Sequence, residues 1–213
     1  MVLATGITGN ASVGTQVAKF NAIAEARLAA GPEAEFPEIQ AWRRTFSRMG
    51  LKPTQYRCAS ESLLRRFRKE RALPRIHPLV DLCNAISLAF ATPVAVFDVA
   101  QISEGLEVRP ANGDERYLTF SGQTENPGAY EVIFADALGR AHARRWTNRQ
   151  SGHSAVGDTT AAVLIVAEAM HGSASVDIPE LVTAVADGLR SAWAVTPETM
   201  TLSRLSPRFE FSA

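Results

Sequence analysis

The feature that most constrains the fold is a change of hydrophobic period near Thr92. Before it, apolar residues recur at helical spacing. This pattern predicts helices over residues 15–30, 37–50, 59–71 and 78–91. After it, short β-type runs alternate with turn signals to about Thr147. Helices in the N-terminal part of the chain, strands after them and one more helix near the C-terminus predict an α+β domain.

The β-type runs predict short strands over residues 2–5, 94–97, 106–108, 117–120 and 131–134. Residues 160–170 fit either a strand or a helix. A helix is expected over 178–193 and a closing strand near 209–211, and Ser60 is the expected N-cap of the third helix. Because there is neither a repeat nor a linker, we expect a single domain over 1–213, with the N-terminal strand and first helices in 1–56 and a C-terminal helix and tail in 171–213.

Composition excludes several classes of protein. The chain has 22 basic and 22 acidic residues, so any nucleic-acid contact must come from a local patch. No apolar run approaches the ~18 residues that span a bilayer, and two cysteines are too few for a disulfide framework. A cytoplasmic protein without a membrane partner is therefore expected.

Motifs for metal or cofactor binding are also missing. The four histidines are scattered and no zinc-type spacing occurs. The glycine loop GITGNASVGT lacks the lysine of a phosphate loop, which favours a plain strand-to-helix turn. We expect neither a metal nor a cofactor.

The third predicted helix carries a local excess of positive charge. Residues 57–75 contain seven basic and two acidic side chains, and Leu63, Leu64 and Phe67 form the apolar side. The outward cations are Arg65, Arg66, Arg68 and Lys69. They suit phosphate binding, and hence RNA, but a solvated helix face explains them equally well. A second cluster of basic residues, over 140–149, adds modest support for RNA binding.

The fourth helix has one apolar stripe that includes Cys83, which is typical of a small core residue. Asn84 lies off the stripe and is expected to face a second layer. Its amide can bond a neighbouring loop or contact a substrate.

The stretch RIHPLVDLCNAISLAFATPVAVFDVAQISEGLEVRPA resembles the B3/B4 editing module of the bacterial phenylalanyl-tRNA synthetase β subunit. Stand-alone proteins with this module are more similar still, through YRCASESLLRR and RRWTNRQS. The resemblance covers about residues 57–170. It implies a β-sandwich-like sheet with flanking helices, hydrolysis of the ester of misacylated tRNA, an aminoacyl-tRNA partner and no DNA.

The resemblance also implies a site, with two departures from the family. The family's Thr-Asn pair falls on Cys83 and Asn84, its histidine on Ala95, and its glycine-rich turn on 147–150. Glu168 lies near the family's acidic strand residue. A pocket is expected between Asn84, the turn 113–115 and the segment 146–150.

Roles follow from what an ester needs, namely a placed water and donors for the developing oxyanion. Asn148, Arg149 and Gln150 are the candidate donors. Glu115 and Asp114 are the candidates for orienting the water or the substrate's ammonium group. Other candidate substrate contacts are Asn84, Cys83, Trp146 and Thr159. Trp146 suits either a core or a base-stacking role, and Thr159 either a strand start or a pocket hydroxyl.

Three functions remain open at this point. The first is a trans-acting hydrolase of misacylated tRNA. The second is a module that binds tRNA or an amino acid without chemistry, and the third is a hydrolase of another small ester. Asn148 and Arg149 favour retained polar chemistry, whereas Ala95 in place of histidine favours altered or lost editing.

Overall fold

The computed structural model of the chain describes residues 1–211. Its helices are α1 (Gly14–Ala30), α2 (Pro37–Arg48), α3 (Ala59–Glu70), α4 (Pro78–Phe90) and α5 (Ala174–Trp193). The first four end within two residues of the predicted bounds. The α+β class is confirmed.

The strands form two main antiparallel sheets. The first sheet, in the order β10-β1-β9-β2, contains β1 (Val2–Thr5), β2 (Val94–Asp98), β9 (Ala162–Ala167) and β10 (Glu198–Thr199). The second, in the order β3-β6-β7-β8, contains β3 (Glu107–Pro110), β6 (Val132–Ala135), β7 (Ala141–Arg144) and β8 (Arg149–Gln150). A separate hairpin joins β4 (Tyr117–Leu118) to β5 (Thr124–Glu125).

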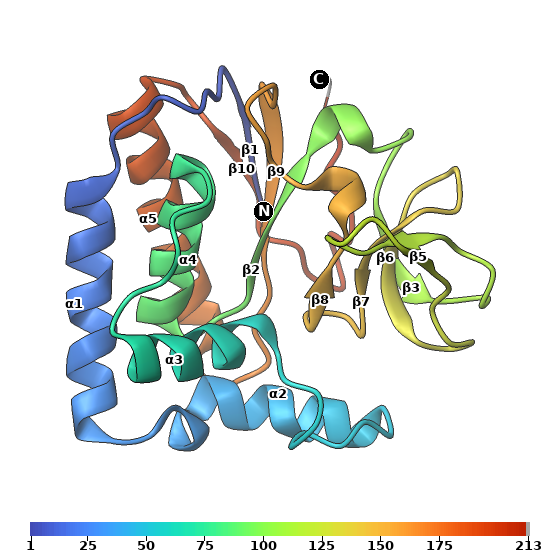
Figure 1. Cartoon of the computed structure of the whole chain (residues 1–213), viewed down its shortest axis with the longest axis horizontal. Helices are drawn as coiled ribbons and strands as arrows, with labels where there is room; N and C mark the ends of the chain where they lie inside the picture. Colours follow the sequence, from blue (N-terminus) through green and yellow to red (C-terminus); the bar gives the residue numbers. More distant parts are fainter. Residues whose placement is uncertain (212–213) are drawn as a thin grey trace.

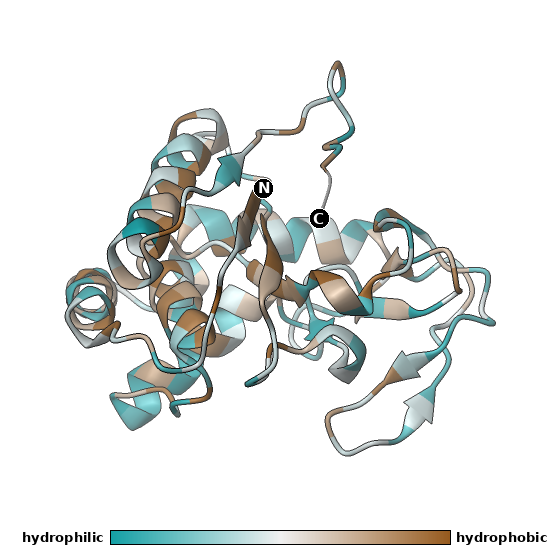
Figure 2. Ribbon diagram, turned by 90° about the horizontal axis from the view of Figure 1, so that it is seen from above, coloured by the Kyte–Doolittle hydropathy of each residue, from teal (hydrophilic) through white to brown (hydrophobic). Residues whose placement is uncertain are grey.

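The central strands of the first sheet are buried on both faces, with helices on one side and the second sheet on the other (Figure 1). Val163 and Ile165 of β9 pack with α1, α4 and α5, whereas Leu164 and Val166 pack against Phe134 of the second sheet. This alternation is the two-residue period of a strand. It also explains why β9 reads as a continuous apolar run, and Figure 2 shows hydrophobic colouring on the central strands.

A second hydrophobic cluster is formed mainly by α2 and α3. Trp42 and Phe46 of α2 pack with Leu64 and Phe67 of α3, and all four are fully buried. Trp146 contacts both this cluster and the cluster between the sheets. It therefore joins the helices to the second sheet.

Three local predictions were wrong. The N-cap position of α3 is Cys58 rather than Ser60, whose buried hydroxyl lies 3.4 Å from the Cys58 thiol. Helix α5 starts before residue 178 because Asp177 accepts a hydrogen bond from Ser173 and contacts His171, which fixes an additional turn. Residues 209–211 form no strand, and β10 pairs with β1 instead.

None of the helices within residues 1–211 combines the length and the apolar character needed to cross a membrane.

Candidate functional site

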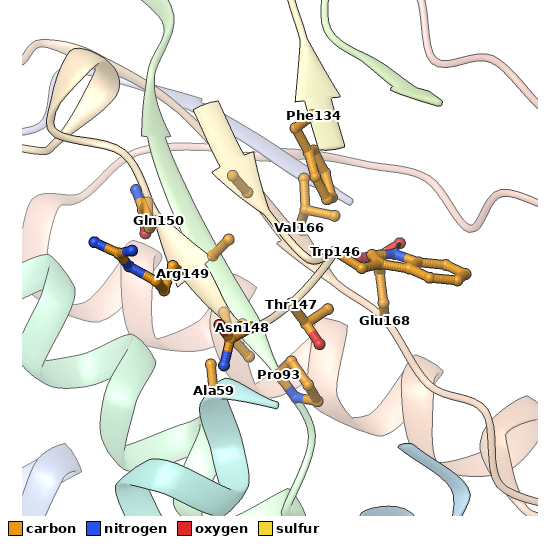
Figure 3. Close-up of a pocket in the computed structure, with 13 residues that line it drawn as sticks. Ala59, Pro93, Phe134, Trp146, Thr147, Asn148, Arg149, Gln150, Val166 and Glu168 are labelled. Atoms are coloured by element: carbon orange, nitrogen blue, oxygen red, sulfur yellow. Dashed lines mark hydrogen bonds between the residues drawn. The ribbon is translucent and has the colours of Figure 1, made fainter. Parts of the chain in front are cut away.

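A small cavity of about 60 Å³ lies where the start of α3, strands β2 and β9, and the β7–β8 turn meet (Figure 3). That volume is several times what one water molecule requires. Its apolar wall consists of Ala59, Pro93, Val94, Ala95, Phe134, Ala143 and Val166. Its polar groups come from Trp146, Thr147, Asn148, Arg149, Gln150 and Glu168. Its lining, apolar with a few converging polar groups, is that of a small-ligand site, although its volume is below the usual range.

The β7–β8 turn forms the polar side of the cavity. Arg145 and Trp146 adopt left-handed backbone angles, with φ of 46° and 60°, although neither is glycine. Such residues cost of order 1–3 kcal/mol each and persist where the surroundings hold them. Here the Trp146 N–H donates to the Val132 carbonyl, and the Thr147 carbonyl accepts from Ala59, both at 2.7 Å. The turn is thereby fixed to β6 and to α3.

Glu168 is the titratable group of the cavity. The residue is half-buried and follows β9, and its Oε1 accepts a hydrogen bond of 2.8 Å from the Trp146 indole. Burial raises the pKa of Glu168 to about 7, and the indole N–H only partly offsets this. Thr147 adds a buried hydroxyl with no hydrogen-bond partner among residues 1–211. The lining therefore includes a carboxyl that titrates near neutral pH and, on another residue, an unsatisfied hydroxyl.

The predicted segment 146–150 lines this cavity, but two of its polar groups are already engaged. The Asn148 amide donates to the Arg57 carbonyl at 2.7 Å, and the Gln150 amide donates to the Val96 carbonyl at 2.6 Å. These bonds hold the turn against α3 and β2. Both amide nitrogens therefore have structural partners in addition to facing the cavity.

Arg149 stands at the rim, and its side chain points away from Trp146 and Glu168 (Figure 3). Its guanidinium lies 3.3 Å from Glu125 and 5.2 Å from the centre of the Tyr117 ring.

The predicted convergence of three segments was wrong, because Asn84 and the turn 113–115 do not line this cavity. Glu115 is buried elsewhere. Its carboxylate accepts from the backbone N–H groups of Asn112 and Gly113 and from Arg109. Although burial raises it, these bonds hold the pKa of Glu115 at about 2. Glu115 thus closes its own turn.

The remaining predicted contacts also lie away from this cavity. Cys83 is in the helical core, where burial raises the pKa of its thiol to about 12. Asn84 is half-buried on α4, and its side chain makes no hydrogen bond within residues 1–211. Asp114 and Thr159 are exposed in turns.

The basic helix does point its cations outward, as predicted. Arg65 and Arg68 are each 45% exposed and both contact the buried Glu33, at 3.3 and 2.9 Å. Arg66 pairs with Glu70 at 2.8 Å, and Lys69 is exposed. These cations are exposed and partly neutralised by acidic residues, as expected for a solvated helix face. They also remain accessible to phosphate.

Residues 41–178, well over half of the chain, match the family described as the B3/4 domain. The chain belongs to this family. The resemblance seen in the sequence is therefore confirmed, and it extends beyond the residues 57–170 that carried it.

Curated relatives of this B3/4 protein are phenylalanine–tRNA ligase β subunits. That of Coxiella burnetii is 39% identical over 57 residues, which cover 27% of this chain and 7% of the relative. That of Shewanella oneidensis is 33% identical over 91 residues, which cover 42% and 11%. The chain thus matches only a small part of the relatives' length. The crystal structure of an N-terminal fragment of the Pyrococcus horikoshii phenylalanyl-tRNA synthetase β subunit aligns with a TM-score of 0.46 at 11% identity, covering 56% of this chain and 41% of that one.

The B3/4 protein also contains a Ser-His-Asp network outside the cavity. His142 contacts the Ser154 hydroxyl at 2.8 Å and the Asp136 carboxylate at 3.1 Å. Ser154 and His142 are fully buried, and Arg140 also binds Asp136. Burial lowers the pKa of His142. A substrate cannot reach this serine, so the network holds β7 to the following loop.

A cluster of Glu38, His171 and Asp177 has the ligand types of a metal site. However, Arg27 already donates to both oxygens of Glu38, at 2.8 and 2.9 Å. A guanidinium at this position supplies the positive charge that a metal ion would otherwise bring. The cluster is therefore best described as a hydrogen-bonded ion network.

Sequence reasoning missed the hydrogen bond between Trp146 and Glu168, which defines the cavity, and the role of Thr147. A signal was present, since Glu168 directly follows a long apolar run and is the kind of carboxyl that burial perturbs. What the sequence does not reveal is that β9 ends opposite the β7–β8 turn.

Proposed function

We propose that this B3/4 protein hydrolyses the ester of misacylated tRNA, with the aminoacyl group in the cavity beside Glu168. The names of its curated relatives, phenylalanine–tRNA ligase β subunits, point to tRNA as the partner class. The observation that carries the proposal is Glu168, a carboxyl of raised pKa in a small apolar cavity. Perturbed carboxyls in clefts are common among catalytic acids and bases.

The chemistry needs one base and one water. Glu168 accepts a proton from water, whose oxygen bonds to the ester carbonyl carbon. The bond from that carbon to the ribose oxygen then breaks, and the proton returns to the leaving oxygen. A base whose pKa lies near the working pH is the most effective for such transfers. The Thr147 hydroxyl, which is free to donate, suits the developing oxyanion.

The alternative is a module that binds aminoacyl-tRNA or an amino acid without chemistry. Two observations favour it. Ala95 lines the cavity where the synthetase family has histidine, and the amides of Asn148 and Gln150 already donate to backbone carbonyls. Under this alternative Glu168 holds the substrate ammonium or a polar side chain.

The experiment is a deacylation screen of the full chain against a panel of mischarged tRNAs, with Glu168→Gln as the test variant. Glutamine keeps an acceptor for the Trp146 indole but cannot titrate. The proposal expects the wild-type rate to rise with pH through about 7, the pKa of Glu168. It expects the variant to lose roughly 10²-fold or more in rate, the typical contribution of a general base.

The matched control is Glu180→Gln, which changes an exposed glutamate on α5. It should deacylate like wild type. Hydrolysis that survives Glu168→Gln with the same pH profile would contradict the role of Glu168. Tight binding of aminoacyl-tRNA without any turnover would favour the binding module.

A further inference from the structure

A second cavity, which is wide open to solvent, adjoins the first on the other side of β8. It has a volume of about 320 Å³ and is lined by Tyr117, Thr119, Phe120, Ser121, Arg149 and Gln150. Its size is at the lower end of the volumes typical of small-ligand sites. Arg149 and Gln150 line both cavities. The two cavities are therefore separated by a single short strand.

The second cavity contains an aromatic ring that the fold leaves in water. Phe120, in the turn between β4 and β5, is 74% exposed. Beside it the hydroxyls of Thr119 and Ser121 lie 2.9 Å apart. The hairpin is fixed to β8, since the Tyr117 hydroxyl donates to the Gln150 carbonyl at 2.8 Å. An exposed ring on a fixed hairpin is a surface on which a planar group can stack.

The charge around this ring favours an anionic ligand. Arg144 and Arg149 both contact Glu125, and Arg144 and Arg145 both contact Glu131. Three guanidiniums thus share two carboxylates, which leaves the cluster with a net positive charge. Arg149 is the accessible member, with 42% of its side chain exposed, compared with 8% for Arg144. A guanidinium of this kind suits phosphate.

We infer that this second cavity binds the terminal nucleotides of single-stranded RNA, with a base on Phe120 and a phosphate at Arg149. Stacking on an aromatic ring combined with a cationic groove is the general mode of single-strand recognition. The inference rests on the proposed function in one respect. An ester joins the aminoacyl group directly to the terminal ribose, so the terminal nucleotide must lie next to the cavity that holds the aminoacyl group, and the second cavity shares Arg149 and Gln150 with it.

The test uses the full chain and a short, fluorescently labelled, uncharged RNA that ends in CCA. Its dissociation constant is measured by anisotropy for wild type, Phe120→Ala and Phe120→Trp. Removing one stacking platform should weaken binding roughly tenfold or more, whereas tryptophan should restore it. Arg149→Ala should weaken binding and flatten its salt dependence. Because Phe120 is exposed, its variants should keep the wild-type melting temperature.

The matched control is Leu138→Ala, which removes another exposed apolar side chain, 62% exposed, from a turn of the second sheet. It should bind the RNA like wild type. Equal affinity of wild type and Phe120→Ala, or an equal loss in Leu138→Ala, would overturn the inference.

Glu168→Gln separates this inference from the proposed hydrolysis. If the second cavity binds RNA, that variant should retain CCA binding even where it loses deacylation. RNA binding that depends on Phe120 in a protein without turnover would support the nucleotide site and contradict the hydrolase. Deacylation with a KM unchanged by Phe120→Ala would support the hydrolase and contradict the nucleotide site.

Discussion

At the scale of single residues, Glu168 couples the cavity to the stability of the fold. Its pKa is about 7 in the folded chain and near the ordinary 4.5 when unfolded. As pH rises through 4.5 the unfolded chain releases this proton first, so the free energy of unfolding falls until about pH 7 and then levels off. Glu168→Gln removes this dependence.

We therefore expect Glu168→Gln to be more stable than wild type at pH 8, and by more than at pH 4. Denaturant unfolding of both proteins at the two pH values measures the difference. Glu180→Gln, on the exposed face of α5, should show no pH-dependent gain. An equal effect of Glu168→Gln at both pH values would mean that this carboxyl titrates normally.

The candidate site was only partly predictable at this scale. The segment 146–150 was recognised, because its residue types and its place in the family resemblance are local properties. Glu115 was misplaced because a carboxylate's partners are not visible in sequence, and here they are two backbone N–H groups and Arg109. Arg149 lies at the rim of the cavity, but the direction of its side chain depends on Glu125, which lies on a separate hairpin.

At the scale of elements, the basic helix α3 is held by a buried acidic residue from another segment. Arg65 and Arg68 both pair with Glu33, which is 1% exposed. Replacing all four cations with alanine should abolish tRNA binding, and it should also destabilise the fold because Glu33 is then buried without a partner. That variant alone cannot separate a loss of phosphate binding from a loss of structure.

The double variant Arg66→Ala/Lys69→Ala leaves both Glu33 pairs intact and therefore tests RNA binding alone. We expect its melting temperature to match wild type and its tRNA affinity to fall. The slope of log affinity against log salt should decrease by about one for each phosphate that the variant no longer neutralises. Filter binding across a salt series measures both quantities. Arg190→Ala/Arg204→Ala, which removes two exposed cations elsewhere, is the control. Unchanged binding in the α3 double variant would mean that these cations are only a solvated face.

Element prediction succeeded where the cause is local and failed where it is not. Helices α1 to α4 follow from apolar spacing, and for α1, α2 and α4 also from proline or glycine at one or both ends. Strand β7 was missed because its buried His142 and Arg144 read as polar surface, although Asp136 and Glu131 pair with them. The C-terminal strand was placed at 209–211, whereas the pairing partner of β1 is at 198–199.

At the scale of the whole molecule, the main sheet and the hydrophobic core include elements that lie outside the residues matched by the family. The B3/4 match spans 41–178, but β1 is an interior strand between β10 and β9. Val2, Leu3 and Ala4 are each at most 3% exposed. Helix α5 contributes Leu181, Val185 and Leu189 to the helical core. The main sheet and its helical cover therefore depend on both ends of the chain.

We expect a fragment of residues 41–178 to lack cooperative unfolding, because it exposes the β1 side of β9 and one face of α4. A fragment of residues 1–200, which retains β10, should unfold cooperatively with only a modest loss of stability. Circular dichroism during thermal and urea unfolding compares the two with the full chain. The expectation follows from the burial of β9 on both faces. Without β1, such a strand exposes apolar side chains and unpaired backbone N–H and C=O groups to water. A cooperative transition in the 41–178 fragment would contradict this expectation, and would mean that the second sheet, α3, α4 and the remaining part of α2 form a core of their own.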